Sequence, residues 1–350
     1  MSSPTRVGVI GAGGWGTALS ILLARKGFRV DLWAREEAVA REISTSRTNE
    51  TFLPGVVVPE GVTARTALDE VVHDAPLLFV PVPAQHMRAV IRAARPYLRQ
   101  DQVVIHAGKG IEEGTLLRLS QVLAEELPRE LHGNIGVISG PSHAEEVARE
   151  VPTALVAASV NDDVAKLAQD TLMCPTMRVY TSHDVIGVEL GGALKNVIAV
   201  ATGIADGLGF GDNTRAALMT RGLAEIARLG IALGANPLTF AGLSGMGDLV
   251  VTCMSMHSRN RRAGIEIGRG RKVKDVLAST PMVVEGIPTT RAAVELGRRA
   301  GVQMPVAEKL YEILFSGLDP MQAVVDLMTR DPQAETSPVF RKGLNILDGI

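Results

Sequence analysis

Short apolar runs alternate with amphipathic stretches through the first half of the chain. A strand buried on both faces of a sheet is a continuous apolar run, whereas a helix repeats its apolar positions every 3.6 residues. The alternation predicts a doubly wound, mostly parallel α/β sheet of the Rossmann type. Strands are expected at Val7–Gly11, Arg29–Trp33, Leu77–Val82, Gln102–His106, Ile135–Ser139 and Thr153–Ala158, and helices at segments such as Ala18–Arg25, Met87–Tyr97 and Leu116–Leu127.

Beyond about Asp184 the strand pattern fades, and helical patterns separated by Gly or Pro remain. We therefore divide the chain into a dinucleotide-binding domain, residues 1–183, and an all-helical substrate-binding and catalytic domain, residues 184–350. From about Asp331 no periodicity is visible, which predicts a loosely attached surface segment. The helices of the second domain are expected at Val185–Gly203, Arg215–Leu233, Thr289–Ala300 and Val306–Leu314.

A glycine-rich loop follows the first predicted strand. Gly11, Gly13 and Gly16 have the G-x-G-x-x-G spacing between a strand and a helix, and a second strand follows at βαβ distance. Gly11 would allow the tight turn, Gly13 the approach of a pyrophosphate, and Gly16 close packing of helix on strand. The free N–H groups of the helix N-terminus favour phosphate. This context favours a dinucleotide-binding site. The alternative interpretation is a glycine-rich turn that binds no ligand.

The end of the second strand bears on which dinucleotide binds. NAD sites place an acidic residue about 20 residues past the glycines. Here Arg35 stands near that position, and Asp31 lies too early in the strand to reach the ribose. An arginine there can pair with a 2′-phosphate, which favours NADP(H) with NAD(H) also usable. The alternative is a solvated charged turn, because Glu36 and Glu37 follow.

Composition narrows the function classes. The 350 residues are 46% hydrophobic and 21% charged with a net charge of −2, which gives no general attraction for nucleic acid or an anionic membrane. Aromatic residues make up only 3%, which disfavours base stacking. The two cysteines, Cys174 and Cys253, form no disulfide framework, and no His spacing is typical of a metal site. We expect no metal and no nucleic-acid partner.

The same features predict a cytoplasmic protein. The first strand begins by Arg6, which leaves no room for a signal peptide, and few cysteines suit a reducing compartment. No apolar run approaches the ~18 residues that span a bilayer, so no membrane span is expected.

Lys195 is the most conspicuous candidate for chemistry. It lies in a very apolar helical stretch, with Gly191 and Gly192 leaving room for a ligand beside the helix. Burial lowers the pKa of a lysine, which makes the amine a base near neutral pH. The alternative is a lysine that extends along the helix surface with its charge in water.

Three further segments are candidates. Asp248, framed by glycines, could hold a lysine in place, or could simply cap a helix. The basic run Ser258–Arg262 predicts a phosphate pocket, the alternatives being a solvated helix face and, less favoured without aromatics, a nucleic-acid patch. The loops His106–Gly110 and Ser139–Ala144 follow strands, where open α/β sheets bind ligands, although each could be a plain turn.

Taken in order, these motifs resemble the bacterial-type NAD(P)-dependent glycerol-3-phosphate dehydrogenases from about Arg6 to about Met328. Related β-hydroxyacid dehydrogenases share single motifs, such as the lysine–asparagine pair on a helix, but lack the Ser-Arg-Asn-Arg-Arg run. The resemblance rests on Gly11–Thr17, Gly108–Gly110, Ser139–Ser142, Gly191–Asn196, Gly245–Leu249, Ser258–Arg262 and Val283–Gly286.

The resemblance implies roles for individual residues. Lys195 would accept the proton of the substrate's C2 hydroxyl, Asp248 would orient it near the substrate, and Lys109 would contact both cofactor and substrate. The substrate site would also include Gly140, Ser142, Ser258, Arg259 and Asn260. The cofactor site would join the loop glycines Gly11, Gly13 and Gly16 to Gly14, Trp15, Arg35, Lys109, Ala144, Arg259, Val283 and Glu285.

Two positions depart from the family pattern. Gly14 stands where serine is frequent, so a hydroxyl contact to phosphate is lost, and His143 stands where Phe or Asn is more familiar.

The implied reaction is hydride transfer between C2 of sn-glycerol 3-phosphate and the nicotinamide, with dihydroxyacetone phosphate as the oxidised product. The family's usual role is to supply glycerol 3-phosphate for phospholipid synthesis. Two alternatives remain: a related β-hydroxyacid dehydrogenase, and a non-catalytic NADP(H)-binding sensor, for which the glycine loop and Arg35 would suffice. The sequence leaves open whether the chain forms a homodimer.

Overall fold

The computed structural model describes residues 5–332 and Glu335. Eight strands form one sheet in the order β3-β2-β1-β4-β5-β6-β7-β8. All neighbours are parallel except β6 and β7, so the predicted doubly wound, mostly parallel sheet is confirmed. The strands are β1 (Arg6–Ile10), β2 (Arg29–Trp33), β3 (Val62–Arg65), β4 (Leu77–Val80), β5 (Val103–His106), β6 (Ile135–Ser139), β7 (Thr153–Ala158) and β8 (Met177–Ser182).

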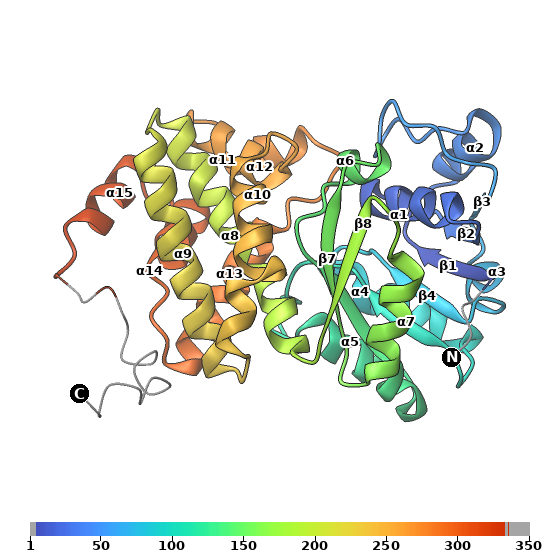
Figure 1. Ribbon diagram of the computed structural model, residues 1–350. Coiled ribbons are helices and arrows are strands. Elements are labelled where there is room, and N and C mark those ends of the chain that lie inside the picture. Colours follow the sequence, from blue (N-terminus) through green and yellow to red (C-terminus); the bar gives the residue numbers. More distant parts are fainter. Residues whose placement is uncertain (1–4, 333–334, 336–350) are drawn as a thin grey trace.

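Helices cover both faces of this sheet (Figure 1). One apolar core joins the sheet to α1, α2, α6 and α7, and a second joins it to α3, α4 and α5. Because both faces are covered, β4, β5 and β6 are buried throughout, which explains why their sequences are mostly apolar. The helices are α1 (Gly14–Arg25), α2 (Glu37–Ser46), α3 (Leu68–Val72), α4 (Ala84–Ala94), α5 (Leu119–Glu126), α6 (Ala144–Ala148) and α7 (Asp162–Leu172).

Several predicted elements of this domain need correction. The strands β3 and β8 were not predicted, because they are the two edges of the sheet and carry exposed polar residues instead of an apolar run. The helix expected at Leu116–Leu127 begins only at Leu119, since Leu116 has a left-handed backbone with φ of 63° that no helix continues.

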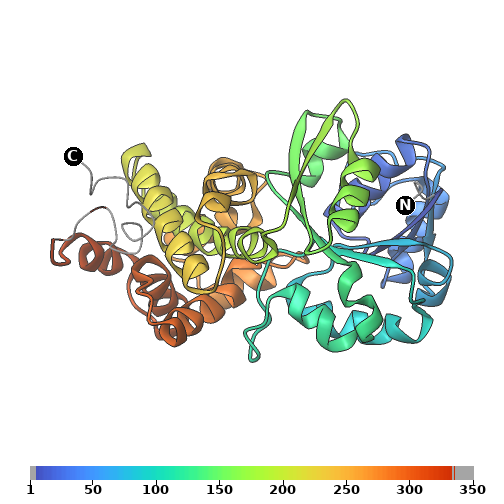
Figure 2. The ribbon, with the colours of Figure 1, turned by 60° about the horizontal axis from the view of Figure 1, so that its bottom comes forward.

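The rest of the chain is helical, as predicted, and surrounds the long helix α8 (Figures 1 and 2). The helix expected at Val306–Leu314 is α14 followed by a π-helical turn at Glu312–Ser316. The helices are α8 (Val185–Gly207), α9 (Asp212–Ala232), α10 (Asp248–Met254), α11 (Arg259–Gly268), α12 (Val273–Ala278), α13 (Gly286–Ala300), α14 (Pro305–Tyr311) and α15 (Pro320–Met328).

Helix α8 is one turn longer than the predicted Val185–Gly203 and is very apolar, as the sequence indicated. Its length and composition would suffice to cross a membrane, but 83% of its most apolar window is buried inside the protein. It is therefore the core helix of the second domain. The surface segment predicted from about Asp331 lies almost entirely outside the described residues.

Glycines let α8 and α11 cross at backbone contact. A Cβ atom on Gly203 of α8 would lie 2.2 Å from the carbonyl oxygen of Arg261. A Cβ atom on Gly264 of α11 would lie 2.2 Å from the carbonyl oxygen of Val200. Real Cβ atoms do not come this close to a carbonyl oxygen, so the crossing requires glycine on both helices. It holds the first turn of α11 beside α8.

We expect Gly264→Ala to lower the free energy of unfolding by about 1–3 kcal/mol, because the added methyl group must push two packed helices apart. Urea unfolding measures the loss. Gly133→Ala is the matched control, since a Cβ there would meet nothing within 4 Å. Equal stability of the two variants would contradict the tight crossing.

Candidate active site

A cavity of about 330 Å³ lies where the carboxyl ends of the central strands meet the helical domain. The chain leaves β1 in one direction across the sheet and returns to β4 on its other side, and ligands bind at such a switch point. The predicted residues that line the cavity are Gly11, Gly13, Gly14, Trp15, Arg35, Lys109, Ser142, Ala144, Lys195, Ser258, Arg259, Asn260, Val283 and Glu285. Three others lie behind this lining: Gly16, Gly140 and Asp248.

The glycine loop occupies one end of the cavity. Gly11 has φ of 125°, a backbone conformation that favours glycine, and a Cβ on Gly16 would lie 1.8 Å from the Gly11 carbonyl oxygen. A Cβ on Gly13 would meet nothing within 4 Å, so the backbone is bare where it lines the cavity. At Gly14 a Cβ would lie 2.7 Å from the Phe52 carbonyl oxygen, so the backbone packing at this position favours glycine.

One carboxylate joins two lysines from the two domains. Asp248 accepts a hydrogen bond from Lys195 on one oxygen and from Lys109 on the other, the latter at 2.8 Å. Lys195 also donates to the Thr252 hydroxyl at 2.8 Å, and Lys109 to the Gly140 carbonyl at 2.8 Å. Lys195 is 5% exposed and Asp248 1%, so the alternative of a surface lysine is wrong.

Asp248 is not a helix cap either. A π-helical turn at Leu243–Gly247 runs directly into α10, and Gly247 at the cap position already has a helical backbone. The carboxylate is therefore free to bind the two lysines.

Burial sets the proton affinities of this cluster. It lowers the pKa of Lys195 to about 7, with the charge of Lys109 lowering it further and that of Asp248 opposing the shift. Burial alone would raise the pKa of Asp248, but the charges of Lys109 and Lys195 outweigh it and the net direction is downward. Asp248 therefore stays ionised, whereas Lys195 can gain or lose a proton near neutral pH.

An amide network ties this cluster to the basic segment. Asn196, next to the lysine on α8, donates to the carbonyl of Lys109 at 2.9 Å. Asn260 donates to the Asn196 side-chain oxygen at 2.8 Å and accepts from the Gly286 N–H at 2.9 Å. The side chain of Asn260 thus positions three elements and keeps one N–H for another partner.

The basic run at Ser258–Arg262 does not act as a single patch. Ser258 caps α11, with its hydroxyl oxygen accepting from the Arg261 N–H at 3.2 Å. Arg261 binds Asp206 at 2.8 Å, an internal ion pair of the helical domain. Arg259 lines the cavity, and burial lowers its pKa while the charge of Glu285 opposes this. The cluster therefore supplies one arginine to the cavity.

Two more charged residues, Arg35 and Glu285, line the cavity. Arg35 is largely exposed and donates to the adjacent Glu36 at 2.8 Å, and both line the cavity. Asp31 is buried in an ion pair with Arg6 at 2.6 Å. One oxygen of Glu285 accepts from the Ala84 N–H at 2.9 Å, and the other is buried without a hydrogen-bond partner. Burial raises the pKa of Glu285 to about 7.

Sequence reasoning missed Thr252. It lies one helical turn after Asp248 and binds the same lysine, so an acid and a hydroxyl four residues apart were the available signal. His257 and Asn196 also line the cavity, and Asn196 could have been noticed beside Lys195.

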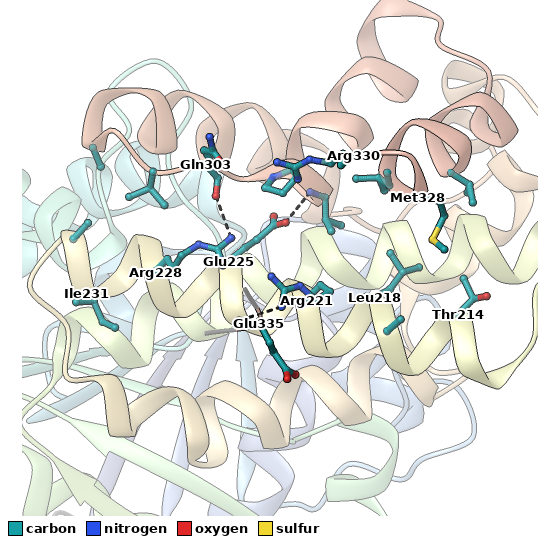
Figure 3. A pocket seen from close by; sticks show the side chains of 18 of the residues that line it. Thr214, Leu218, Arg221, Glu225, Arg228, Ile231, Gln303, Met328, Arg330 and Glu335 are labelled. Atoms are coloured by element: carbon teal, nitrogen blue, oxygen red, sulfur yellow. Dashed lines mark hydrogen bonds between the residues drawn. The ribbon is translucent and has the colours of Figure 1, made fainter. Parts of the chain in front are cut away.

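A larger cavity of about 1090 Å³ lies within the helical domain and shares no residue with the first (Figure 3). Its walls are apolar residues of α9, α14 and α15, together with Arg221 and Arg228. Glu225 is buried among them and accepts from the Val306 N–H at 2.8 Å, so it caps α14. Lacking a lysine and the glycine loop, this cavity offers no comparable chemistry. Among residues 5–332 and Glu335, no cluster of His, Cys, Asp or Glu could hold a metal.

Comparison with known proteins identifies one family. Two family models, described as the N-terminus and C-terminus of NAD-dependent glycerol-3-phosphate dehydrogenase, match residues 6–165 and 184–325. A protein of Pelotomaculum thermopropionicum named glycerol-3-phosphate dehydrogenase, with NAD(P)+ in its name, is 54% identical over 95% of this chain and 96% of its own length. A Moorella thermoacetica protein of the same name is 53% identical over 93% of this chain and 96% of its own.

A solved structure supports the same family assignment. The crystal structure of glycerol-3-phosphate dehydrogenase from Coxiella burnetii superposes with a TM-score of 0.89 and 38% identity, over 94% of this chain and all of that one. The family resemblance inferred from the sequence motifs is confirmed.

We expect Asp248→Asn to lower the free energy of unfolding by about 3–5 kcal/mol, because two ammonium groups lose their shared buried counter-charge. The pKa of Lys195 is already lower in the folded than in the unfolded chain, and loss of Asp248 lowers it further. The extra loss is therefore greatest where Lys195 is protonated and shrinks as pH rises through about 7. Urea unfolding at about pH 6 and about pH 8.5 measures this dependence.

The exposed Asp101→Asn serves as the control for a general effect of charge. A loss that is equal at both pH values, or no larger than that of the control, would show that Asp248 does not hold the lysines.

Proposed function

The chain belongs to the NAD-dependent glycerol-3-phosphate dehydrogenase family, and on that premise we propose that it interconverts sn-glycerol 3-phosphate and dihydroxyacetone phosphate with NAD(P)(H). The observation that carries the proposal is the buried Lys195–Asp248 pair, whose lysine lines the same cavity as the glycine loop. A sensor of NADP(H) would need no such pair.

The residues present fit a nicotinamide dinucleotide. The bare backbone at Gly13 and the first turn of α1 suit a pyrophosphate, and the unpartnered oxygen of Glu285 lies in the same cavity. When bound, the nicotinamide donates or accepts the hydride. We propose that Gly11, Gly13, Gly14, Trp15, Gly16, Lys109, Ala144, Arg259, Val283 and Glu285 hold this cofactor, with Arg35 at a 2′-phosphate.

Lys195 serves as the general acid and base in this proposal. In the reductive direction its ammonium group gives a proton to the oxygen forming at C2, and in the oxidative direction the neutral amine takes the proton back. A pKa of about 7 lets the same group do both near neutral pH. Asp248 and Thr252 fix the direction of the amine by accepting its hydrogen bonds.

The substrate phosphate binds at the start of α11 in this proposal. Arg259 offers a planar pair of donors that matches a phosphate, and Asn260 retains one N–H. Ser258, Ser142 and the Gly140–Lys109 contact complete the proposed substrate site. A neutral polyol would offer these groups little binding energy, so an anionic substrate explains them better.

We place the boundary between the cofactor domain and the substrate domain at residues 183/184. The end of β8 at Ser182 and the start of α8 at Val185 support this division.

The test is the decay of NADPH absorbance on adding dihydroxyacetone phosphate. Lys195→Ala should lower kcat by ~10²–10⁴-fold, the usual contribution of a positioned acid and base. Cofactor affinity, measured by fluorescence titration, should survive, since Lys195 is not among the proposed cofactor ligands. A folded variant with nearly wild-type kcat would refute the assignment.

Substrate controls test the reaction itself. Unphosphorylated dihydroxyacetone and a panel of 3-hydroxy acids should turn over far more slowly than the phosphorylated substrate. Faster turnover of a 3-hydroxy acid would identify a related dehydrogenase instead, and no turnover of any substrate would favour the sensor.

NADP(H) preference is a separate proposal that rests on Arg35. Arg35→Asp should raise the KM for NADPH much more than the KM for NADH, because it removes a partner of the 2′-phosphate and adds a like charge. Glu37→Gln, an exposed neighbour on α2, is the control. Equal changes in both KM values would instead favour a solvated turn in which Arg35 pairs only with Glu36.

A further inference from the structure

His143 has an unused buried nitrogen in the active-site cavity. It lies between β6 and α6, occupies the N-cap position of α6, and lines the cavity with Lys109 and Lys195. Its Nε2 atom is buried and has no hydrogen-bond partner among the described residues. Leaving a buried polar atom unpaired is costly, so such an atom in a binding cavity points to a ligand group.

The surroundings of His143 favour the neutral form of its ring. Burial is the largest cause that lowers the pKa of His143, and the charges of Lys195 and Lys109 act in the same direction. Glu145 and a hydrogen bond to the Val251 backbone oppose them, with the net direction downward. In a neutral ring only one nitrogen carries a hydrogen. We assign that hydrogen to Nδ1, so that Nε2, the buried nitrogen without a partner, has a lone pair.

The surroundings of the ring keep it in this state. His257 lies on its other side, with the ring centroids 5.9 Å apart, and the Nδ1 atom of His257 is 4.0 Å from a carboxylate oxygen of Glu145. Glu145 is thus shared with a second, more exposed imidazole. Lys109 and Lys195, whose charges act on His143, are both bound to Asp248, and neither is a hydrogen-bond partner of Nε2.

We propose that Nε2 of His143 accepts a hydrogen bond from the C1 hydroxyl of the substrate and so selects for it. The inference rests on the proposed function. Phosphate oxygens and the C2 carbonyl oxygen are acceptors and cannot pair with an acceptor, and Lys195 serves the oxygen at C2. The C1 hydroxyl is the one remaining donor that glycerol 3-phosphate and dihydroxyacetone phosphate share.

The experiment removes each partner in turn. Dihydroxyacetone phosphate is compared with hydroxyacetone phosphate, which has a methyl group in place of the C1 hydroxymethyl group. The ratio of their kcat/KM values is measured with NADPH for the wild type, His143→Phe, His143→Gln and, as a control, His73→Phe, an exposed histidine outside the cavity. Circular dichroism melting confirms that each variant is folded.

We expect His143→Phe to reduce this ratio by about 3- to 10-fold, the range of one neutral hydrogen bond. His143→Gln, whose amide oxygen can accept, should restore part of it, and His73→Phe should leave it unchanged. In the wild type alone, the ratio should also fall as pH drops through the lowered pKa of His143, since the protonated ring can no longer accept.

Three results would overturn the inference. The ratio could be the same in the wild type and in His143→Phe, or His143→Gln could fail to rescue it. Alternatively, His143→Phe could reduce discrimination against unphosphorylated dihydroxyacetone, which would place the ring at the phosphate. If the wild type turns over dihydroxyacetone phosphate but the ratio is unchanged in His143→Phe, only this inference is wrong. If the wild type does not turn over dihydroxyacetone phosphate at all, the proposed function is wrong as well.

Discussion

The Asp248 carboxylate is the contact on which the active site depends. Each of its oxygens binds a lysine from a different domain, Lys109 from the loop after β5 and Lys195 from α8. A buried charge is tolerated only when it is paired, so the buried Lys195 and the partly buried Lys109 both depend on this carboxylate. The same interaction therefore joins the domains, holds the proposed acid and base in position, and keeps the loop of Lys109 against the helical domain.

Glycines and amides hold helix α11 beside α8 and the Lys109 loop. Gly203 and Gly264 bring α8 and α11 together at backbone distance, and Asn196 and Asn260 then connect the two helices to each other and to the Lys109 loop. Side chains on rigid, closely packed helices lose little entropy when they bind a ligand. The packing of α11 on α8, more than its own charge, places the segment after Ser258 at the cavity.

Burial gives the cavity its unusual proton affinities. It lowers the pKa of Lys195 and raises that of Glu285, each to about 7, because both lose the charged form's hydration. Groups that change charge near neutral pH and line one cavity are typical of functional sites. Arg261, by contrast, forms an ion pair with Asp206 inside the helical domain and does not line the cavity.

The sequence by itself determined the sheet, the glycine loop, the helical second half and the family, because these depend on local periodicity and on motifs of fixed spacing. It also identified Lys195 and Asp248 as candidates, but left a surface lysine and a helix cap open. Only the tertiary structure decided between them, since the two residues lie 53 positions apart and meet through helix packing. It likewise divided the basic run, so that Arg259 lines the cavity while Arg261 forms an internal ion pair. The edge strands β3 and β8 escaped prediction for a related reason: their stability comes from pairing with a neighbouring strand, which an apolar pattern does not record.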